Sequence, residues 1–233
     1  MKNLAIVTGA SAGIGKATAE WFLRNNFDVI CVARRPCPLA AVTSIECDLL
    51  SALPDDVQHQ LIAAIEAAGE TSIVHCAGQH NGDTALTLSR QKLTDALAIN
   101  VTAPAMLNQS LLPVMKAGSS VIFVGSTLGD KAVAGAIGYV TSKHAVNGLM
   151  RATCQDLAGK QIHTAVVSPG FTDTEMLRAH LGDKPEVMAS VLATVTQGRL
   201  IDVHEIAETI GFCATHPVIN GSVIHANLGQ VER

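Results

Sequence analysis

The sequence of 233 residues predicts an α/β protein of one domain (1–233), in which a doubly wound parallel sheet lies between two layers of helices. Three observations support this three-layer α/β/α fold. Apolar segments of strand length alternate along the chain with segments of helical periodicity. The strand-like segments are nearly continuous runs of Val, Ile, Ala and Cys, as expected where helices cover both faces of a parallel sheet. The first of them leads through a glycine-rich turn directly into a helix.

The elements follow one another in the order that such a sheet requires. The first strand begins the segment LAIVTGA, and the apolar positions of the next helix recur at helical spacing, at Ile14, Ala17 and Trp21. Further strands are predicted at 27–33, 44–48, 72–78, 120–126, 163–170 and 222–226. Further helices are predicted at 54–68, 90–100, 104–116, 139–158 and 204–215, and a helical excursion is predicted at about 171–197.

Composition argues against several classes of function. Sixteen Lys and Arg and twenty Asp and Glu give the chain a net charge of −4. The sequence contains no basic block that would bind nucleic acid. The apolar runs are far shorter than the roughly 20 residues that cross a bilayer, so we expect a cytoplasmic protein with no membrane partner. Six cysteines without a C-x-x-C pair and nine histidines without an H-E-x-x-H spacing predict reduced thiols and no metal site.

The glycine-rich turn is the first candidate site. In TGASAGIG, residues 8–15, the glycines have the spacing G-x-x-x-G-x-G. Glycines tolerate the conformations of a tight turn, and their lack of side chains lets backbone N–H groups approach a diphosphate at the positive end of a helix. A turn with a structural role only is the alternative. The candidate cofactor-binding residues here are Gly9, Ser11, Gly13, Ile14 and Gly15.

The motif T-G-x-x-x-G-x-G, here Thr8, Gly9, Gly13 and Gly15, resembles that of the classical short-chain dehydrogenase/reductase (SDR) family. The resemblance runs nearly end to end, because further motifs follow in the family's order. It implies a Rossmann-type fold, a bound nicotinamide dinucleotide, and hydride transfer between that cofactor and a carbonyl or secondary alcohol.

The end of the second predicted strand, CVARRP, bears on the choice of cofactor. Where relatives that prefer NAD carry an acidic residue, this chain has Ala33 followed by Arg34 and Arg35, which suit a 2′-phosphate. We therefore expect NADP(H), with NAD(H) as the second candidate. Two solvated arginines are the alternative interpretation. Asp48 matches the family residue that contacts the adenine amino group, and a turn or helix-capping aspartate is its alternative.

The only tyrosine, Tyr139, stands four residues before Lys143 in a predicted helix, so the two side chains share one face. A neighbouring cation lowers the pKa of a phenol from about 10, which suits an acid or base that works near neutral pH. The resemblance assigns Ser126 a hydrogen bond to the substrate oxygen, Asn100 a water-linked proton path, and Lys143 the nicotinamide ribose. These four residues match the family's catalytic tetrad. A turn serine and a helix-interior amide are the alternatives for Ser126 and Asn100.

Two further segments resemble cofactor contacts of the family. Ala77 and Gly78 follow the fourth predicted strand as the small pair that leaves room for adenosine. In SPGFTDTEM, Pro169 and Gly170 match the pair beside the nicotinamide, and Thr174 matches the residue near its carboxamide.

Two segments depart from the family pattern. His75 and Cys76 replace the asparagines of N-N-A-G, and we expect a hydrogen-bonded structural histidine and a small buried thiol there. Asn227 and Leu228 replace the first two residues of the closing D-G-G, which puts the family's C-terminal contacts in doubt.

These observations predict an NADP(H)-dependent oxidoreductase that acts on a small neutral carbonyl or alcohol, with Tyr139 as acid/base. A non-catalytic NADP-sensing regulator and a lyase or epimerase on the same fold are the alternatives. The apolar side chains of the excursion form either a pocket wall or only the helix's own core face. The family's helix packing predicts a homodimer or homotetramer, and the small residues Ala145, Gly148 and Ala152 would permit close approach of two subunits.

Overall fold

A computed structural model describes residues 1–182 and 185–230, without the side chain of His180. Seven parallel strands form one sheet in the order β3-β2-β1-β4-β5-β6-β7. The predicted doubly wound α/β fold is confirmed. Residues 183–184 of the predicted excursion and 231–233 of the predicted domain lie outside the described residues.

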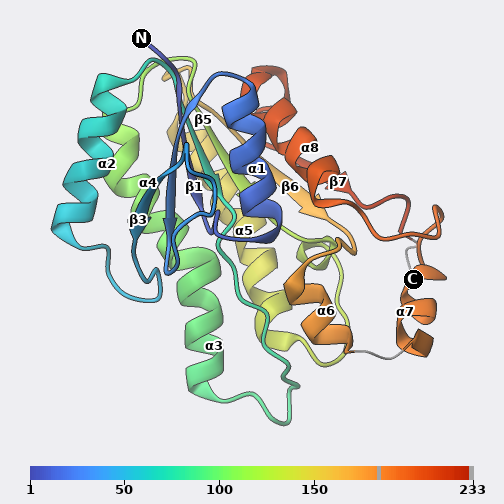
Figure 1. Cartoon of the computed structure of the whole chain (residues 1–233). Helices are drawn as coiled ribbons and strands as arrows, with labels where there is room; N and C mark the ends of the chain where they lie inside the picture. The colour runs from blue at the N-terminus through green and yellow to red at the C-terminus, as the bar shows by residue number, and fades with distance from the viewer. Residues whose placement is uncertain (183–184, 231–233) are drawn as a thin grey trace.

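The elements are distributed as Figure 1 shows. The strands are β1 (Leu4–Thr8), β2 (Asp28–Ala33), β3 (Thr43–Glu46), β4 (Thr71–His75), β5 (Ser120–Val124), β6 (His163–Pro169) and β7 (Ser222–Ala226). The helices are α1 (Gly13–Arg24), α2 (Asp55–Ala67), α3 (Arg90–Leu97), α4 (Ala103–Leu111), α5 (Ile137–Asp156), α6 (Glu175–Leu181), α7 (Pro185–Leu192) and α8 (Val203–Thr215). A π-helical turn, η1 (Ala98–Thr102), joins α3 to α4.

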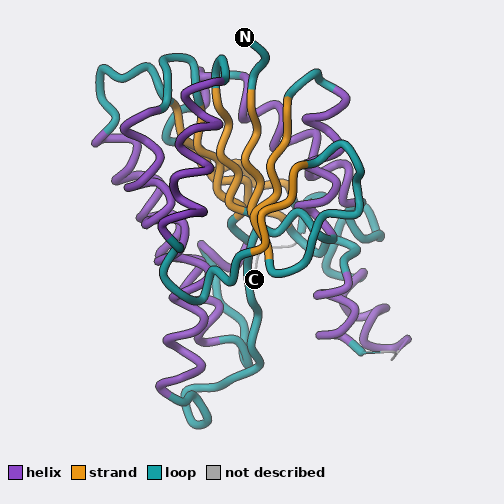
Figure 2. Tube along the Cα trace, turned by 60° about the vertical axis from the view of Figure 1, so that its left-hand side comes forward, coloured by secondary structure: helices purple, strands orange, loops and turns teal. Residues whose placement is uncertain are grey.

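Figure 2 shows the sheet between two layers of helices. On one face, Leu61 of α2, Leu107 of α4 and Met150 of α5 are buried in one apolar core. On the other, Phe22 of α1 and Ile210 of α8 are buried in a second. Each large side chain buried in this way contributes roughly 1.5–3 kcal/mol. Because both faces are covered, β1, β4 and β6 are buried along their whole length, which explains the apolar residues at their centres.

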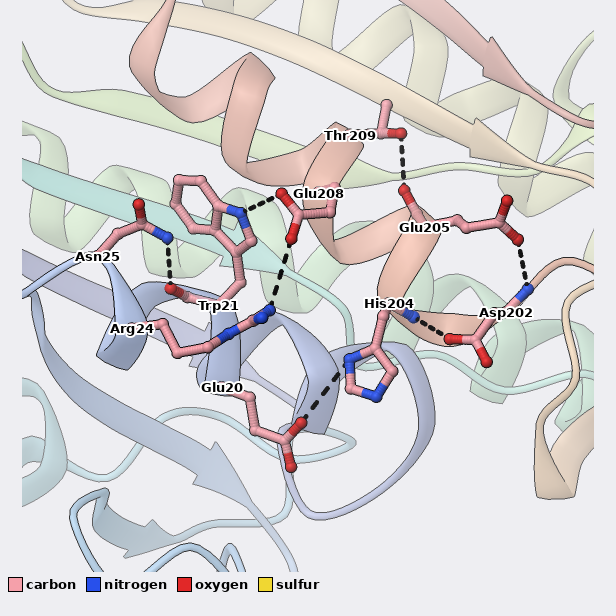
Figure 3. A network of polar contacts seen from close by, with 9 residues as sticks. All are labelled: Glu20, Trp21, Arg24, Asn25, Asp202, His204, Glu205, Glu208 and Thr209. Atoms are coloured by element: carbon pink, nitrogen blue, oxygen red, sulfur yellow. Dashed lines mark hydrogen bonds and ion pairs between the residues drawn. The ribbon is translucent and has the colours of Figure 1, made fainter.

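Helices α1 and α8 meet through close packing and exposed polar contacts (Figure 3). The indole of Trp21 lies where a Cβ on Gly211 would stand, so the crossing requires a glycine. Trp21 Nε1 donates a hydrogen bond to Glu208 Oε2 at 2.8 Å, and Arg24 lies 3.5 Å from the other oxygen of that carboxylate. These contacts fix the second helical layer against the sheet.

Several boundaries differ from the sequence prediction. Helix α5 begins two residues before Tyr139, and the helix predicted at 104–116 ends at Leu111. Pro113 explains the second difference, because proline lacks the N–H that continues a helix, and a short 3₁₀ turn follows instead. Within the predicted excursion, the described residues include the two short helices α6 and α7.

Among the described residues, no helix is both long and apolar enough to span a membrane. Within the same residues, no group of His, Cys, Asp and Glu side chains is arranged to hold a metal ion. All six cysteines are free thiols, and Cys31, Cys47 and Cys213 are buried.

Candidate active site

The carboxyl ends of the strands lie at the lower edge of the sheet in Figure 1, where α3 and α6 extend beyond the strands. Strand β1 pairs with β2 on one side and β4 on the other. The connections diverge at this point, which is where open α/β sheets bind ligands. The predicted site residues follow the carboxyl ends of six strands or lie in η1 and α5.

The glycine turn after β1 is packed against the end of β4. Gly9 has φ +72°, and a Cβ there would lie 2.9 Å from the backbone of Ala77. Ala77 N donates to Thr8 Oγ1 at 3.0 Å, which ties the two strand ends together. A Cβ on Gly15 would collide with the carbonyl of Gly9, so α1 can begin this close to the turn only with glycine.

The N-terminus of α1 has the features of a phosphate site. Ala12 at the N-cap offers no side-chain acceptor, and the first turn contains no acidic residue. The positive end of the helix and its first N–H groups are therefore available to an anion. Ser11 and Ile14 of this turn are half-buried. A nicotinamide dinucleotide, whose diphosphate carries two negative charges, fits these residues.

The segment after β6 reaches back to the glycine turn. Thr174 caps α6 by accepting from Leu177 N at 3.2 Å, and its methyl group would lie 3.5 Å from a Cβ on Gly13. Pro169 ends β6. Gly170 lies so close to Asn227 that a Cβ would be 3.0 Å from the Asn227 Cα. The structure thus brings the two predicted cofactor segments together.

Lys143 is buried beside Tyr139. The Lys143 side chain donates from Nζ to the carbonyl oxygen of Val124 at 2.8 Å, and Nζ lies 5.5 Å from the centroid of the Tyr139 ring. Burial lowers the pKa of Lys143 to about 8, and the nearby Cys76 opposes that shift. The ammonium is therefore still mainly protonated at neutral pH.

The predicted lowering of the Tyr139 pKa is wrong, because the pKa is raised. Burial raises the pKa of the phenol, and the neighbouring Ser126 side chain opposes that rise. Ser126 also caps the turn that follows β5, because its Oγ accepts from Leu128 N at 3.1 Å. Ser126 therefore caps a turn, as its alternative interpretation expects, and it also lies beside Tyr139.

Asn100 lies in the π-helical turn and is buried. Its Oδ1 accepts from Gln79 N at 3.0 Å, and its Nδ2 donates to Gln79 O at 3.1 Å and to Ser142 Oγ at 2.8 Å. Ser142 Oγ donates in turn to the backbone oxygen of Tyr139 at 2.8 Å. Asn100 therefore joins the loop after β4 to the helix of Tyr139.

Gly78 lies between these groups. A Cβ on Gly78 would stand 3.2 Å from Asn100 Oδ1 and 3.9 Å from Lys143 Nζ. The small residue predicted here therefore leaves space at the centre of the candidate site.

Three predicted cofactor residues lie apart from this cluster. Arg34 and Arg35 are exposed after β2, and neither has a hydrogen bond or ion pair with the rest of the described chain. Asp48 is exposed after β3, where its Oδ1 accepts from Leu50 N at 3.1 Å. The turn role of Asp48 is thus present in the structure, while both arginines are free to meet an anion.

The structural interpretation of His75 is confirmed. The ring is buried, and its Nε2 lies 2.9 Å from Asn108 Oδ1. Burial lowers its pKa to about 4. Cys76 is half-buried, and burial raises the pKa of its thiol to about 12, although the nearby Thr18 hydroxyl and Lys143 ammonium oppose that rise. This side chain is therefore a poor nucleophile at neutral pH.

Three residues of the site have no counterpart in the sequence prediction. Ser142 stands three residues after Tyr139, so helical spacing alone could have indicated it. Asp83 and His80 belong to the loop after β4 and reach Gly138 and Tyr139 of α5. No local pattern links that loop to α5, because the contact exists only in the folded chain.

Comparisons with known proteins agree with this geometry. A model of the short chain dehydrogenase family matches residues 3–184. The 3-oxoacyl-[acyl-carrier-protein] reductase FabG of Vibrio cholerae is 31% identical over 98% of this chain and 97% of its own. Ipsdienol dehydrogenase of Ips pini is 28% identical over 94% of this chain and 93% of its own.

Solved structures are similar over nearly the whole chain. The aldohexose dehydrogenase of Thermoplasma acidophilum, in ligand-free form, superposes with a TM-score of 0.90 at 25% identity, over 98% of this chain and 93% of its own. These relatives are reductases and dehydrogenases, which does not support the alternative of a non-catalytic regulator. The chain therefore belongs to the short-chain dehydrogenase/reductase family, oxidoreductases that bind NAD(P) and act on CH–OH or carbonyl groups of small molecules.

Proposed function

We propose that the protein is an NADP(H)-dependent oxidoreductase that moves a hydride between nicotinamide and the carbonyl or secondary alcohol carbon of a small neutral substrate. The observation that carries the proposal is that the Tyr139 phenol lies beside the Ser126 hydroxyl and the buried Lys143 ammonium. It lies at the same sheet edge as the glycine turn, so the substrate and the dinucleotide would share one site.

In the reductive direction, Tyr139 is the general acid. When bound, NADPH supplies the hydride that reaches the carbonyl carbon. The hydroxyl of Ser126 donates a hydrogen bond to the carbonyl oxygen, and Tyr139 donates its proton to that oxygen, which becomes the alcohol. The raised pKa of the phenol keeps it protonated at neutral pH, as an acid must be. The Lys143 ammonium stabilises the phenolate that remains.

The remaining predicted residues would hold the dinucleotide. The turn after β1 suits the diphosphate, the residues after β2, β3 and β4 suit the adenosine half, and α5 with the segment after β6 suits the nicotinamide half. The binding residues we propose are Gly9, Ser11, Gly13, Ile14, Gly15, Arg34, Arg35, Asp48, Ala77, Gly78, Tyr139, Lys143, Pro169, Gly170 and Thr174.

NADP(H) is the proposed cofactor because Arg34 and Arg35 are exposed and free of carboxylate partners among the described residues. A 3-oxoacyl (acyl-carrier-protein) reductase of Agrobacterium tumefaciens, solved with NADP bound, supports this choice at a TM-score of 0.86, 25% identity, and coverage of 97% of this chain and 93% of its own. The Arg34→Ala, Arg35→Ala protein should lose about 10-fold or more in NADPH affinity and keep its NADH affinity, because a hydrogen bond to a charged group contributes roughly 1.5–3 kcal/mol. Equal losses for the two cofactors in a titration would contradict the assignment.

The charges near α6 support the proposal of a neutral substrate. The guanidinium of Arg178 makes hydrogen bonds of 2.6 and 2.7 Å to the Asp173 carboxylate, so its charge is already compensated. Leu177, Val187 and Val191 are half-buried and are suited to an apolar pocket wall.

We also propose a cytoplasmic homodimer or homotetramer that packs through α4 and α5, and a monomeric mass in solution would contradict it.

The test is NADPH oxidation with a panel that contains a neutral ketone, an aldehyde, a quinone, an aldohexose and a 3-oxoacyl thioester. Tyr139→Phe should lose roughly 10²-fold or more in turnover, because general acid catalysis is worth that much, and should still bind NADPH. Full activity of this variant would refute the mechanism. Parallel assays with NADH test the cofactor preference.

A further inference from the structure

Helix α5, which carries Tyr139 in its first turn, has no cap from its own neighbours. Ala136 occupies the N-cap and has no side-chain acceptor. The first N–H groups of a helix lack intrahelical partners and need acceptors from elsewhere. Asp83, in the loop after β4, provides one, because its Oδ1 accepts from Gly138 N at 3.0 Å across 55 residues of sequence.

The backbone of Asp83 strengthens this contact. Asp83 N donates to Gly135 O at 3.1 Å, and Ile137 N donates to Asp83 O at 3.4 Å. Asp83 therefore contacts the three residues around the start of α5 through its side chain and both of its backbone groups. Asp83 as a whole residue is 3% exposed, so solvent does not compete for these bonds.

The fit leaves little freedom at the residue before Tyr139. Gly138 is buried, and a Cβ there would lie 3.0 Å from Asp83 Oδ2. That oxygen is buried and has no hydrogen-bond partner within the described structure. An incompletely paired buried carboxylate costs stability. The cap that Asp83 provides to α5 therefore comes with a cost in stability that a fully paired, exposed cap does not have.

The loop between β4 and Asp83 also contacts the phenol. Asn100 holds Gln79 through both the N–H and the carbonyl oxygen of that residue, and Asp83 holds the other end of the loop. Between these anchors, the ring of His80 lies 4.6 Å from the ring of Tyr139, centroid to centroid. The segment 79–83 is thus fixed at both ends and packs on the catalytic side chain.

We propose that Asp83 is a positioning residue of the active site. Asp83 holds the first turn of α5 in place. This keeps the Tyr139 hydroxyl beside the Ser126 side chain and the Tyr139 ring in contact with the His80 ring. The inference rests on the proposed role of Tyr139. It goes beyond that role by assigning the placement of the acid to a carboxylate from a different strand connection.

The single tyrosine makes this testable without turnover. The ultraviolet absorbance of tyrosinate reports Tyr139 alone, and circular dichroism shows at which pH values the protein stays folded. Asp83→Ala should loosen the first turn and expose the phenol, so its pKa should fall from its raised value toward about 10. Turnover should fall about 10- to 10²-fold, because misplacing a catalytic group by about 1 Å has that effect. The affinity for NADPH should not change.

Three further variants make the test specific. Asp83→Asn keeps an acceptor for Gly138 N and should retain most of the turnover and the wild-type tyrosine titration. Gly138→Ala leaves Asp83 in place but presses on Oδ2, and should show a weaker form of both defects. Gly82→Ala, in the same loop but with open space around its Cβ, should match the wild type.

Two results would overturn the inference. One is a folded Asp83→Ala protein with the tyrosine titration and turnover of the wild type; should that variant not fold, wild-type values for Gly138→Ala decide the matter in the same way. The other is a defect in Asp83→Asn as large as that of Asp83→Ala. If Tyr139→Phe instead remains active, the proposed function fails, while the titration of Asp83→Ala still decides whether Asp83 places the phenol.

Discussion

Helices α5 and α8 lie on opposite faces of the sheet, and the first N–H groups of the two helices are capped in different ways. In α8, Asp202 Oδ1 accepts from His204 N at 2.8 Å, and the Glu205 side chain accepts from Asp202 N at 2.9 Å (Figure 3). This capping box uses residues within one turn of one another. In α5 the acceptor is Asp83, which comes from a loop between two other elements.

The two helix starts also differ in their exposure to solvent. Asp202 and Glu205 are exposed, and an exposed cap contributes about 1 kcal/mol with little further consequence. Asp83, Asn100 and Lys143 are buried, where polar groups cost stability unless they are fully paired. The start of α8 is therefore a source of stability, whereas the start of α5 holds reactive groups at the expense of stability.

The largest effect is expected for Lys143→Met. Burial lowers the pKa of Lys143 from 10.5 to about 8, so the folded state binds this proton less tightly than the unfolded state. The wild type should therefore become more stable as pH rises from about 8 to 10.5, and Lys143→Met should be more stable than the wild type below pH 8. A gain of about 2–3 kcal/mol at neutral pH follows from about 1.4 kcal/mol per pKa unit, less the lost bond to Val124 O.

Urea unfolding at pH 7 measures this gain, and an assay should show that turnover is lost. Arg199→Met is the matched control at α8, because the Arg199 guanidinium is exposed and pairs with an exposed Glu205. The control should not gain stability. A Lys143→Met protein that is less stable than the wild type would show that the buried ammonium does not cost stability.

The same contrast explains what could be predicted from the sequence. The strand at 222–226 was predicted with the bounds that the structure has, and the helix predicted from residue 204 begins at Val203, because its apolar pattern and its cap are local. The start of α5 was predicted two residues too late, because its cap comes from Asp83. Local pattern defines an element only where its neighbours in sequence are also its neighbours in space.

The candidate site divides in a similar way. Tyr139 and Lys143 could be identified from their i, i+4 spacing, and Ser126 from its place at the end of a strand. The direction in which the pKa of Tyr139 shifts could not be predicted, because the shift depends on burial by residues distant in sequence. The π-helical turn at Asn100 is likewise a tertiary feature, since its amide is held by Gln79 and Ser142.

A second effect, of similar origin, concerns the buried His75. Burial lowers its pKa from 6.5 to about 4, so the unfolded chain takes up a proton first as the pH falls. Stability should therefore be lost between pH 6.5 and 4, by about 2 kcal/mol at pH 5 from this group. The pKa of His163 is also lowered by burial and acts in the same direction.

Urea unfolding at pH 7 and pH 5 measures the loss, and His75→Gln should reduce it by the part due to His75. His204→Gln is the control, because His204 is exposed beside Glu20 at the start of α8. An identical pH dependence in the wild type and His75→Gln would contradict the assignment.

The smallest effect is expected at the exposed cap itself. Asp202→Ala removes the acceptor for His204 N and should lower stability by about 1 kcal/mol, or roughly 2–4 °C in Tm for a chain of this size. Turnover and the tyrosine titration should not change, because α8 contacts the sheet on the face away from α5. Asp83→Ala removes one acceptor from a helix start in the same way, yet should change both. If Asp202→Ala altered turnover as much as Asp83→Ala, the loss of any helix cap would suffice to impair the enzyme, and the placement of Tyr139 would need no special role for Asp83.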